Sequence, residues 1–374
     1  MNLSSRIISL FIILPAVFSS VDALCPAYCN CSVPLVVDCS STALHTIPKD
    51  IDTDTETLDL HNNSITRLKA NSFVSLTSLT ELRLDSNLID TIDDDAFNGT
   101  EVLENLNLAN NRMASLNRTM FDGLLAITSL DVAHNKLSSI DDFTFENMTF
   151  LTTLHLNNNS IVNMTANTFK GIDSLEKLHL HYNKINELKE DTFSDLQNLA
   201  SLRLDVNSIA SIEKKAFNGL NSLTSLKLSS NDLTQVNGDM LEGVEQLEKL
   251  EIDRNWISII EDEPFTKTPK LTNLALNLNN MSVISSAFWT GLGKLQELDL
   301  SYNRLKDVKV DSFKGLTNME YLLLDSNGMQ SIEEGAFNGL ADLAYLQVSF
   351  NELTKVTTDM LTDWEICTPR PLGQ

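Results

Sequence analysis

Four side chains that can carry positive charge recur at a fixed spacing in the middle of the chain. They are His155, His179, Arg203 and Lys227, and each stands 24 residues after the one before. Guanidinium and ammonium groups that lie together attract carboxylates and sulphates. Because the chain has 27 basic against 51 acidic side chains and a formal net charge of −24, a segregated basic strip is informative. The strip is therefore a candidate site for an acidic protein surface or a sulphated glycan, and the alternative is a solvated face that binds no ligand.

Further candidate binding residues adjoin this strip or follow it toward the C-terminus. Those beside the strip are Lys177, His181, Tyr182, Lys249 and Arg254. Those nearer the C-terminus are Tyr302, Tyr321, Leu323, Tyr345 and Phe350. Exposed aromatic side chains are typical of binding hot spots. The alternative for the second group is packing against a following cap or module.

The histidines also raise the question of a metal site. His134, His155, His179 and His181 fall close together, and imidazoles on neighbouring strands can ligate zinc or make binding respond to pH. No acidic residue or cysteine at the same level completes a tetrahedral set. The sequence therefore predicts neither a metal nor a cofactor.

A repeat of 24 residues positions all of these side chains. An asparagine recurs in thirteen units without insertion or deletion, and a leucine stands five residues before every one of them. The asparagines are Asn63, Asn87, Asn111, Asn135, Asn159, Asn183, Asn207, Asn231, Asn255, Asn279, Asn303, Asn327 and Asn351. Alternation of period two around the leucine predicts a short strand in each unit. Ten residues after the asparagine comes a phenylalanine or another large apolar residue.

Stacking is the only way for such units to bury their leucines, since one unit has no core of its own. We expect an α/β repeat solenoid, a curved horseshoe with a parallel β-sheet on the concave face and loops or short helices on the convex face. The asparagine amides would form a ladder along the stack and the phenylalanines a packed spine, so both are structural. Neighbouring strands lie about 4.8 Å apart, which would align the four basic positions in one strip.

Four cysteines stand close together near the N-terminus, at Cys25, Cys29, Cys31 and Cys39. The cluster favours disulfides formed in an oxidising compartment. Its spacing alone allows three pairings, and a zinc site is the competing interpretation.

The repeat resembles that of the leucine-rich repeat family. Residues 202–220 show the pattern Leu-x-Leu-x-x-Asn-x-Ile followed by Ala-Phe-x-Gly-Leu, which is similar to the 24-residue extracellular class. The resemblance covers residues 55–366 as thirteen repeats and residues 24–54 as the cysteine-rich N-terminal cap of that family. It implies pairing of Cys25 with Cys31 and of Cys29 with Cys39.

The two ends of the chain suggest export and an unusual C-terminus. Residues 1–23 read as a signal peptide, with an uncleaved membrane anchor as the alternative. Residues 367–374 are a short tail where the family usually has a second cysteine-rich cap. Cys367 fits a truncated or spliced copy of a longer protein, a buried free thiol, or an intermolecular bridge that would give a disulfide-linked dimer.

Acceptor triplets for N-glycosylation add a steric constraint. They begin at Asn30, Asn62, Asn98, Asn117, Asn147, Asn158, Asn163 and Asn280. Asn62 and Asn158 directly precede ladder asparagines, so glycans there would crowd the inner surface near their own repeats. Ligand contact is then expected further toward the C-terminus.

These patterns together predict a secreted extracellular recognition protein that binds a protein ligand or matrix component through its concave surface. The alternative is the truncated ligand-binding ectodomain of a transmembrane receptor in adhesion, guidance or innate immune signalling, and a structural matrix role comes third. The acidic charge argues against nucleic acid, and no later apolar stretch predicts membrane insertion. Neither a glycine-rich phosphate loop nor His-Glu-x-x-His occurs, so we expect no enzymatic activity.

Overall fold

The leucine five residues before each asparagine points into the core from the centre of a three-residue strand. In β13 (Ser201–Arg203), Leu202 is fully buried, whereas Ser201 and Arg203 on either side of it are partly exposed. Successive side chains of a strand point to opposite faces, so every unit offers one leucine to the core and two side chains to the exposed face of the sheet. The expected alternation is therefore present.

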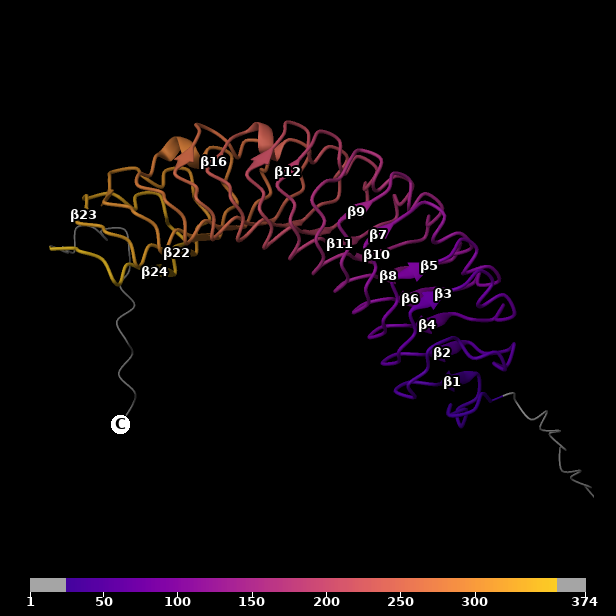
Figure 1. Cartoon of the computed structure of the whole chain (residues 1–374). Helices are drawn as coiled ribbons and strands as arrows, with labels where there is room; N and C mark the ends of the chain where they lie inside the picture. The colour runs from indigo at the N-terminus through magenta and orange to yellow at the C-terminus, as the bar shows by residue number, and fades with distance from the viewer. Residues whose placement is uncertain (1–24, 355–374) are drawn as a thin grey trace, which may run out of the picture.

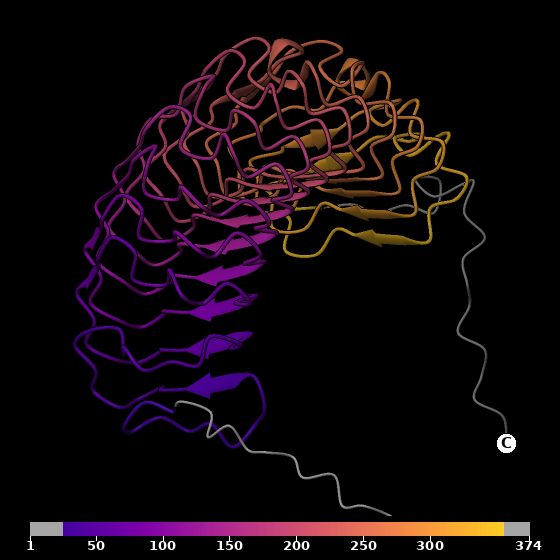
Figure 2. The same cartoon turned by 90° about the vertical axis from the view of Figure 1, so that its right-hand side faces the viewer.

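These strands form one parallel sheet of 14 strands on the inner side of an arc (Figures 1 and 2). They follow one another in chain order, and the strand of each repeat pairs with the next at an offset of 24 residues, as Leu178 does with Leu202. The strands are β1 (Val36–Asp38), β2 (Thr57–Asp59), β4 (Glu81–Arg83), β6 (Asn105–Asn107), β8 (Ser129–Asp131), β10 (Thr153–His155), β11 (Lys177–His179), β13 (Ser201–Arg203), β15 (Ser225–Lys227), β17 (Lys249–Glu251), β19 (Asn273–Ala275), β20 (Glu297–Asp299), β22 (Tyr321–Leu323) and β24 (Tyr345–Gln347).

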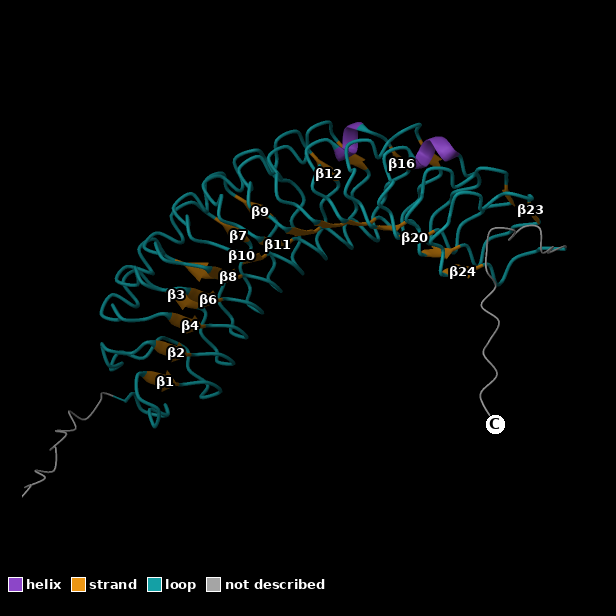
Figure 3. Ribbon diagram, turned by 180° about the vertical axis from the view of Figure 1, so that it is seen from behind, coloured by secondary structure: helices purple, strands orange, loops and turns teal. Residues whose placement is uncertain are grey.

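The return segments cover the outer side of the arc, and they consist mainly of loops and turns (Figure 3). They contain five two-stranded parallel sheets: β3 (Arg67–Leu68) with β5 (Thr91–Ile92), β7 (Ser115–Leu116) with β9 (Ser139–Ile140), β12 (Glu187–Leu188) with β14 (Ser211–Ile212), β16 (Gln235–Val236) with β18 (Ile259–Ile260), and β21 (Asp307–Val308) with β23 (Ser331–Ile332). The helical part of the expected fold is limited, over residues 25–354, to the 3-10 helices η1 (Asp239–Leu241) and η2 (Ser286–Trp289). The horseshoe with a concave sheet and loop or short-helix returns is thus confirmed.

The computed structural model describes residues 25–354. The signal peptide expected at 1–23, the end of the thirteenth repeat and the tail with Cys367 lie outside the described residues.

The repeated asparagines form a hydrogen-bonded ladder through the stack. The Asn231 side-chain nitrogen donates to the carbonyl of Leu228 in its own repeat and to that of Leu204 in the repeat before, both at 3.0 Å. Its Oδ1 accepts the N–H of Ile209, also in the preceding repeat, at 2.9 Å. Asn207 donates to the same Leu204 carbonyl at 3.0 Å. Each amide therefore links its own turn to the preceding one and shares an acceptor with its neighbour.

The convex side is held by stacked aromatic rings and close backbone contacts. Phe193 and Phe217 lie 6.1 Å apart between ring centroids with nearly parallel planes, and Trp289 and Phe313 repeat this stacking at 6.5 Å. Gly219 has a positive φ of 89°, and a Cβ there would overlap the backbone of Ser194 in the preceding repeat. The return segments thus pack backbone to backbone, which only glycine permits at this turn.

The N-terminal cap closes the first edge of the long sheet. Disulfides join Cys25 to Cys31 and Cys29 to Cys39, which is the pairing that the family resemblance implies. Asn30 exchanges two backbone hydrogen bonds with Asp38 on the outer edge of β1. This antiparallel bridge occupies backbone groups that an open sheet edge would expose to another chain.

Replacing a ladder asparagine should destabilise the solenoid. In Asn231→Ala the buried N–H of Ile209 loses its acceptor, and an unsatisfied buried donor costs roughly 1–3 kcal/mol. We expect a clearly lower urea midpoint, followed by far-UV circular dichroism. Asn221→Ala, at an exposed turn, should change the stability by less than about 0.5 kcal/mol. Equal effects of the two substitutions would contradict a structural ladder.

Candidate ligand-binding surfaces

The predicted basic strip is assembled in the expected order. His155 on β10 pairs in register with His179 on β11, which pairs with Arg203 on β13, which pairs with Lys227 on β15. Four consecutive strands of the concave sheet thus present these side chains in one column. The sequence period predicted this arrangement because no insertion shifts the register.

Acidic neighbours compensate most of the charge on this strip, which the sequence analysis did not anticipate. Arg203 donates two hydrogen bonds to Asp205, at 3.0 and 2.8 Å, and these bonds raise the pKa of the guanidinium. Lys227 and Lys249 both bind the carboxylate of Glu251, at 2.9 and 2.7 Å. Burial alone would raise the pKa of Glu251, but the hydrogen bonds from the two lysines outweigh it and lower that pKa. These pairs weaken the argument for a sulphated glycan on the strip.

The cations beside the strip differ in how they are paired. Arg254 lies 3.6 Å from the carboxylate of Asp253 and is otherwise exposed. Lys177, at the start of β11, is exposed and has no ion-pair partner among residues 25–354. Lys177 is therefore the cation of this region most available to a ligand.

The histidine rings of this region pack against each other. The rings of His155 and His179 lie 4.5 Å apart and nearly perpendicular, and His181 lies 5.6 Å from His179. Burial, followed by the charges of His155, His181 and Arg203, lowers the pKa of His179 to about 4, although Asp205 opposes the shift. Burial is also the main reason for the lowered pKa of His181. With a pKa of about 4, the His179 imidazole adds no positive charge to the strip at physiological pH.

His181 has an unusual environment for a polar side chain. It is 9% exposed, and its Nδ1 has no hydrogen-bond partner, while its ring contacts the exposed ring of Tyr182 at 5.8 Å. Among residues 25–354 no group of His, Cys, Asp and Glu side chains is placed to hold a metal ion. The cluster is accordingly a packed aromatic group on the concave face.

The predicted aromatic group near the C-terminal end lies partly on the concave sheet. Tyr321 on β22 and Tyr345 on β24 are each about half exposed, and their rings are 6.3 Å apart. Leu323, also on β22, is partly buried, and Phe350 is 82% exposed. Tyr302 belongs to a different part of the surface.

Tyr302 lines an open groove where the concave strands end and the chain turns toward the outer side. The cavity measures about 630 Å³ and is also lined by Arg254, Trp256, Leu278 and Arg304. Trp256 is 58% exposed and Tyr302 is 55% exposed. We call these five residues the edge groove.

The backbone of three successive repeats aligns the edge groove. Arg254, Leu278 and Tyr302 each stand directly before a ladder asparagine, with φ values of 53°, 55° and 54°. This left-handed conformation is uncommon outside glycine. Because it recurs at a spacing of 24 residues, it presents the three side chains at equivalent places in neighbouring turns.

The sequence analysis missed Trp256 and Arg304, which follow ladder asparagines by one residue. Most other repeats have small or polar residues such as Ser160 and Asp232 at this position. A tryptophan in a column of mostly polar residues is the signal that the sequence offers for Trp256.

Some glycosylation triplets fall near these surfaces. Asn280 is among the residues that line the edge groove. Asn62 is exposed and donates to Ser41 of the cap, and Asn158 is partly buried at the equivalent turn of a later repeat. Attachment of glycans at these positions stays a prediction.

Family models match most of the described chain. A model described as "BspA type Leucine rich repeat region (6 copies)" covers residues 66–200, and one described as "Leucine rich repeat" covers 197–257, 245–305 and 293–353. The chain is a leucine-rich repeat protein. The thirteen ladder asparagines and the stacked strands are the features on which this assignment rests.

Named relatives of this leucine-rich repeat protein match single stretches of it. "Leucine-rich repeat-containing protein 3" of Danio rerio is 44% identical over 78 residues, which is 20% of this chain and 29% of that protein. Biglycan of Sus scrofa is 43% identical over 76 residues, 20% of this chain and 26% of biglycan. The matched stretch thus spans less than a third of each relative.

A solved structure shows the same fold. The leucine-rich repeat domain of APL1B superposes with a TM-score of 0.66 at 24% identity, over 79% of this chain and 82% of that one. The leucine-rich repeat protein is related to extracellular repeat proteins such as biglycan, and its named relatives are not enzymes. Within residues 25–354, no helix is both long enough and apolar enough to cross a membrane.

Acidification should destabilise the protein through His179. The folded side chain has a pKa of about 4 against an ordinary value of 6.5. Between these values the unfolded state binds more protons, so the free energy of unfolding falls as the pH falls from 6.5 toward 4. One pKa unit corresponds to about 1.4 kcal/mol, and with solvent screening we expect a loss of roughly 1–3 kcal/mol.

Urea unfolding near pH 7 and near pH 4.5 measures this loss. His179→Gln should lose less stability on acidification than the unsubstituted protein. The control His45→Gln, at an exposed position of the cap, should lose as much stability as the unsubstituted protein. An unchanged pH dependence in His179→Gln would show that this imidazole is not the group responsible.

Proposed function

We propose that this protein is an extracellular recognition protein that binds a protein ligand through its concave surface and the adjoining edge groove. The observation that carries the proposal is the exposure of Trp256 and Tyr302, at 58% and 55%, although both belong to repeats with further repeats on either side. Repeats precede and follow both residues, so the stacking of the solenoid itself does not cover them. Two large aromatic side chains in one groove are therefore accessible to a ligand.

The composition of the edge groove fits a protein ligand. Tryptophan, tyrosine and arginine are the residues most enriched at binding hot spots, and the groove supplies them as Trp256, Tyr302, Arg254 and Arg304. Arg304 has no ion-pair partner among residues 25–354, so its guanidinium is available to a carboxylate of the ligand. A ligand with an apolar side chain beside an acidic one would match this surface.

The concave sheet extends the same surface toward the C-terminal end of the arc. Tyr321 and Tyr345 lie one and two repeats beyond Tyr302, and both expose about half of their surface. The sheet provides a rigid platform because every strand is paired on both sides except at its ends. Lys177 offers an unpaired charge further toward the N-terminus.

An extracellular setting is supported by two features of the chain. The cap carries two disulfides, which form and persist in oxidising environments. Biglycan, to which part of the chain is similar, is an extracellular protein. Secretion through the expected signal peptide is part of this proposal.

Removing the aromatic side chains of the edge groove should abolish ligand capture. The full chain, produced by secretion, is immobilised and used to capture proteins from extracellular fluid, which are quantified by mass spectrometry. We expect the double variant Trp256→Ala, Tyr302→Ala to reduce the specifically captured protein at least about tenfold, because hot-spot aromatics each contribute about 2 kcal/mol or more.

The matched control is Phe150→Ala, which removes an aromatic side chain that is 62% exposed on a return segment. It should leave capture unchanged, and circular dichroism should show that all variants are folded. Equal capture by the double variant and the unsubstituted chain, or an equal loss in the control, would overturn the proposed role of the groove.

A further inference from the structure

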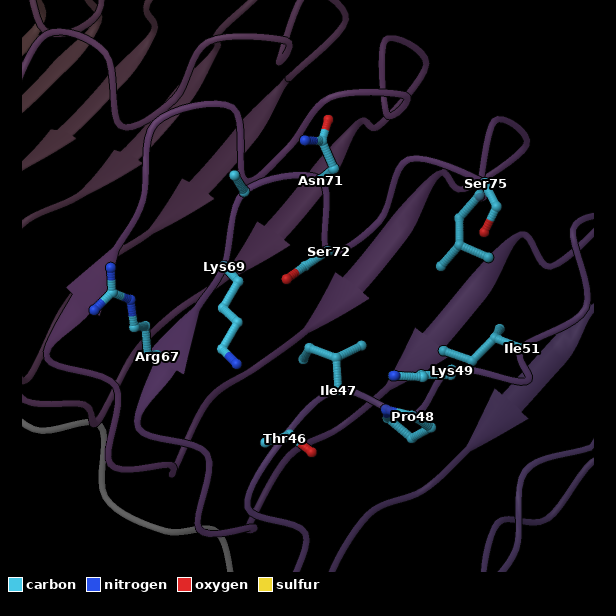
Figure 4. A pocket seen from close by; sticks show the side chains of 12 residues that line it. Thr46, Ile47, Pro48, Lys49, Ile51, Arg67, Lys69, Asn71, Ser72 and Ser75 are labelled. Atoms are coloured by element: carbon cyan, nitrogen blue, oxygen red, sulfur yellow. The ribbon is translucent and has the colours of Figure 1, made fainter.

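A cavity of about 420 Å³ opens at the junction between the N-terminal cap and the first repeat (Figure 4). The cap contributes residues 46–49 and Ile51 to its lining, and the return segment of the first repeat contributes Arg67, residues 69–72, Ser75 and Leu76. The site lies far from the edge groove along the chain, and its existence does not depend on the function proposed above.

The cavity exists because the cap is shorter than a repeat. Val36 of β1 pairs with Thr57 of β2, an offset of 21 residues, whereas Thr57 pairs with Glu81 at the offset of 24 found between repeats. The cap therefore has three residues fewer with which to cover the return segment of the first repeat. Between interior repeats the same segments touch, as the contact of Gly219 with Ser194 shows. A short cap thus leaves a hollow at this one junction.

Positive charge gathers around the hollow on an otherwise acidic protein. Lys49 from the cap and Lys69 from the first repeat both extend toward Ile47 at its centre (Figure 4). Neither lysine has an ion-pair partner among residues 25–354. Arg67 also lines the cavity, but it is held by Asp93 at 2.6 Å. Two unneutralised ammonium groups that face one hollow favour an anionic occupant.

The remaining lining provides groups that suit a sugar. Ile47 and Pro48 offer apolar surface against which a ring can lie, and Ser72 and Ser75 offer hydroxyl groups that can bond to sugar hydroxyls. The volume falls within the range of small-molecule sites. In Figure 4 Ser72 points from the return segment toward Lys69, so a hydroxyl and an ammonium group lie on the same wall.

We propose that this cavity binds an anionic saccharide unit, one that carries sulphate or carboxylate groups. Lys49 and Lys69 hold the anionic groups from opposite walls, the serines bond to ring hydroxyls, and Ile47 supports the ring. The binding site lies outside the concave face and brings residues of the cap together with residues of the first repeat.

Isothermal titration calorimetry of the full chain with a heparin-derived sulphated disaccharide tests the proposal. We expect binding that weakens at least about tenfold in the double variant Lys49→Gln, Lys69→Gln. Lys49→Arg, Lys69→Arg keeps the charge and should retain binding within about threefold. The control Lys306→Gln, Lys309→Gln removes the same charge from exposed positions of a later repeat and should leave affinity unchanged.

Four outcomes would overturn the proposal. Equal weakening in the control would show a diffuse charge effect. Equal affinity for the unsulphated disaccharide would show that the lysines do not bind the sulphate groups. Displacement of the disaccharide by inorganic sulphate at the same concentration would show that the sugar ring does not contribute to binding. Tighter binding of an acidic peptide than of the disaccharide would assign the cavity to a different class of ligand. Retained circular dichroism and cap disulfides confirm that the variants are folded.

Discussion

The asparagine ladder is the interaction on which the rest of the structure depends. Each Leu carbonyl at the end of a strand accepts from the asparagine of its own repeat and from that of the next, as Leu204 does from Asn207 and Asn231. The N–H of Ile209 completes the link by donating to Asn231. Loss of an asparagine would leave such buried groups unpaired, at a cost that outweighs the modest net gain of an ordinary hydrogen bond. The constant period of 24 residues over thirteen units repeats the same linkage in every turn.

Because the period is fixed, equivalent positions of successive repeats form continuous surfaces of the molecule. Because strands stay in register, residues 24 apart become neighbours, and the side chains that the ladder does not use are free to differ between repeats. The concave column that includes Arg203 and the edge groove that includes Trp256 both arise in this way. The cavity beside Lys49 arises from the one place where the period changes, at the cap.

Period and register could be predicted from the sequence because they follow from the recurrence of Leu and Asn alone. The alignment of His179 with Arg203 on adjacent strands was correct for that reason. The compensation of Arg203 by Asp205 was not predicted, since these residues belong to different columns that were considered separately. The low pKa of His179 depends first on burial by its neighbours, which no pattern in the sequence reveals.

Other features had a signal in the sequence that was not used. Trp256 stands out in a column of mostly polar residues, and the 21-residue spacing from Val37 to Leu58 differs from the 24 residues between later leucines. Both departures from the repeat mark places where the surface changes. In a protein this regular, the exceptions to the pattern carry more information about binding than the pattern itself.

Hydrogen exchange at the backbone amides that donate to the ladder tests the central claim most directly. The N–H groups of Ile209, Leu233 and Ile257 donate to Asn231, Asn255 and Asn279. If the ladder fixes the stack, these amides of interior repeats exchange only through large-scale unfolding and at similar slow rates. Exchange as fast as that of an unstructured peptide, with the solenoid still folded, would contradict the account.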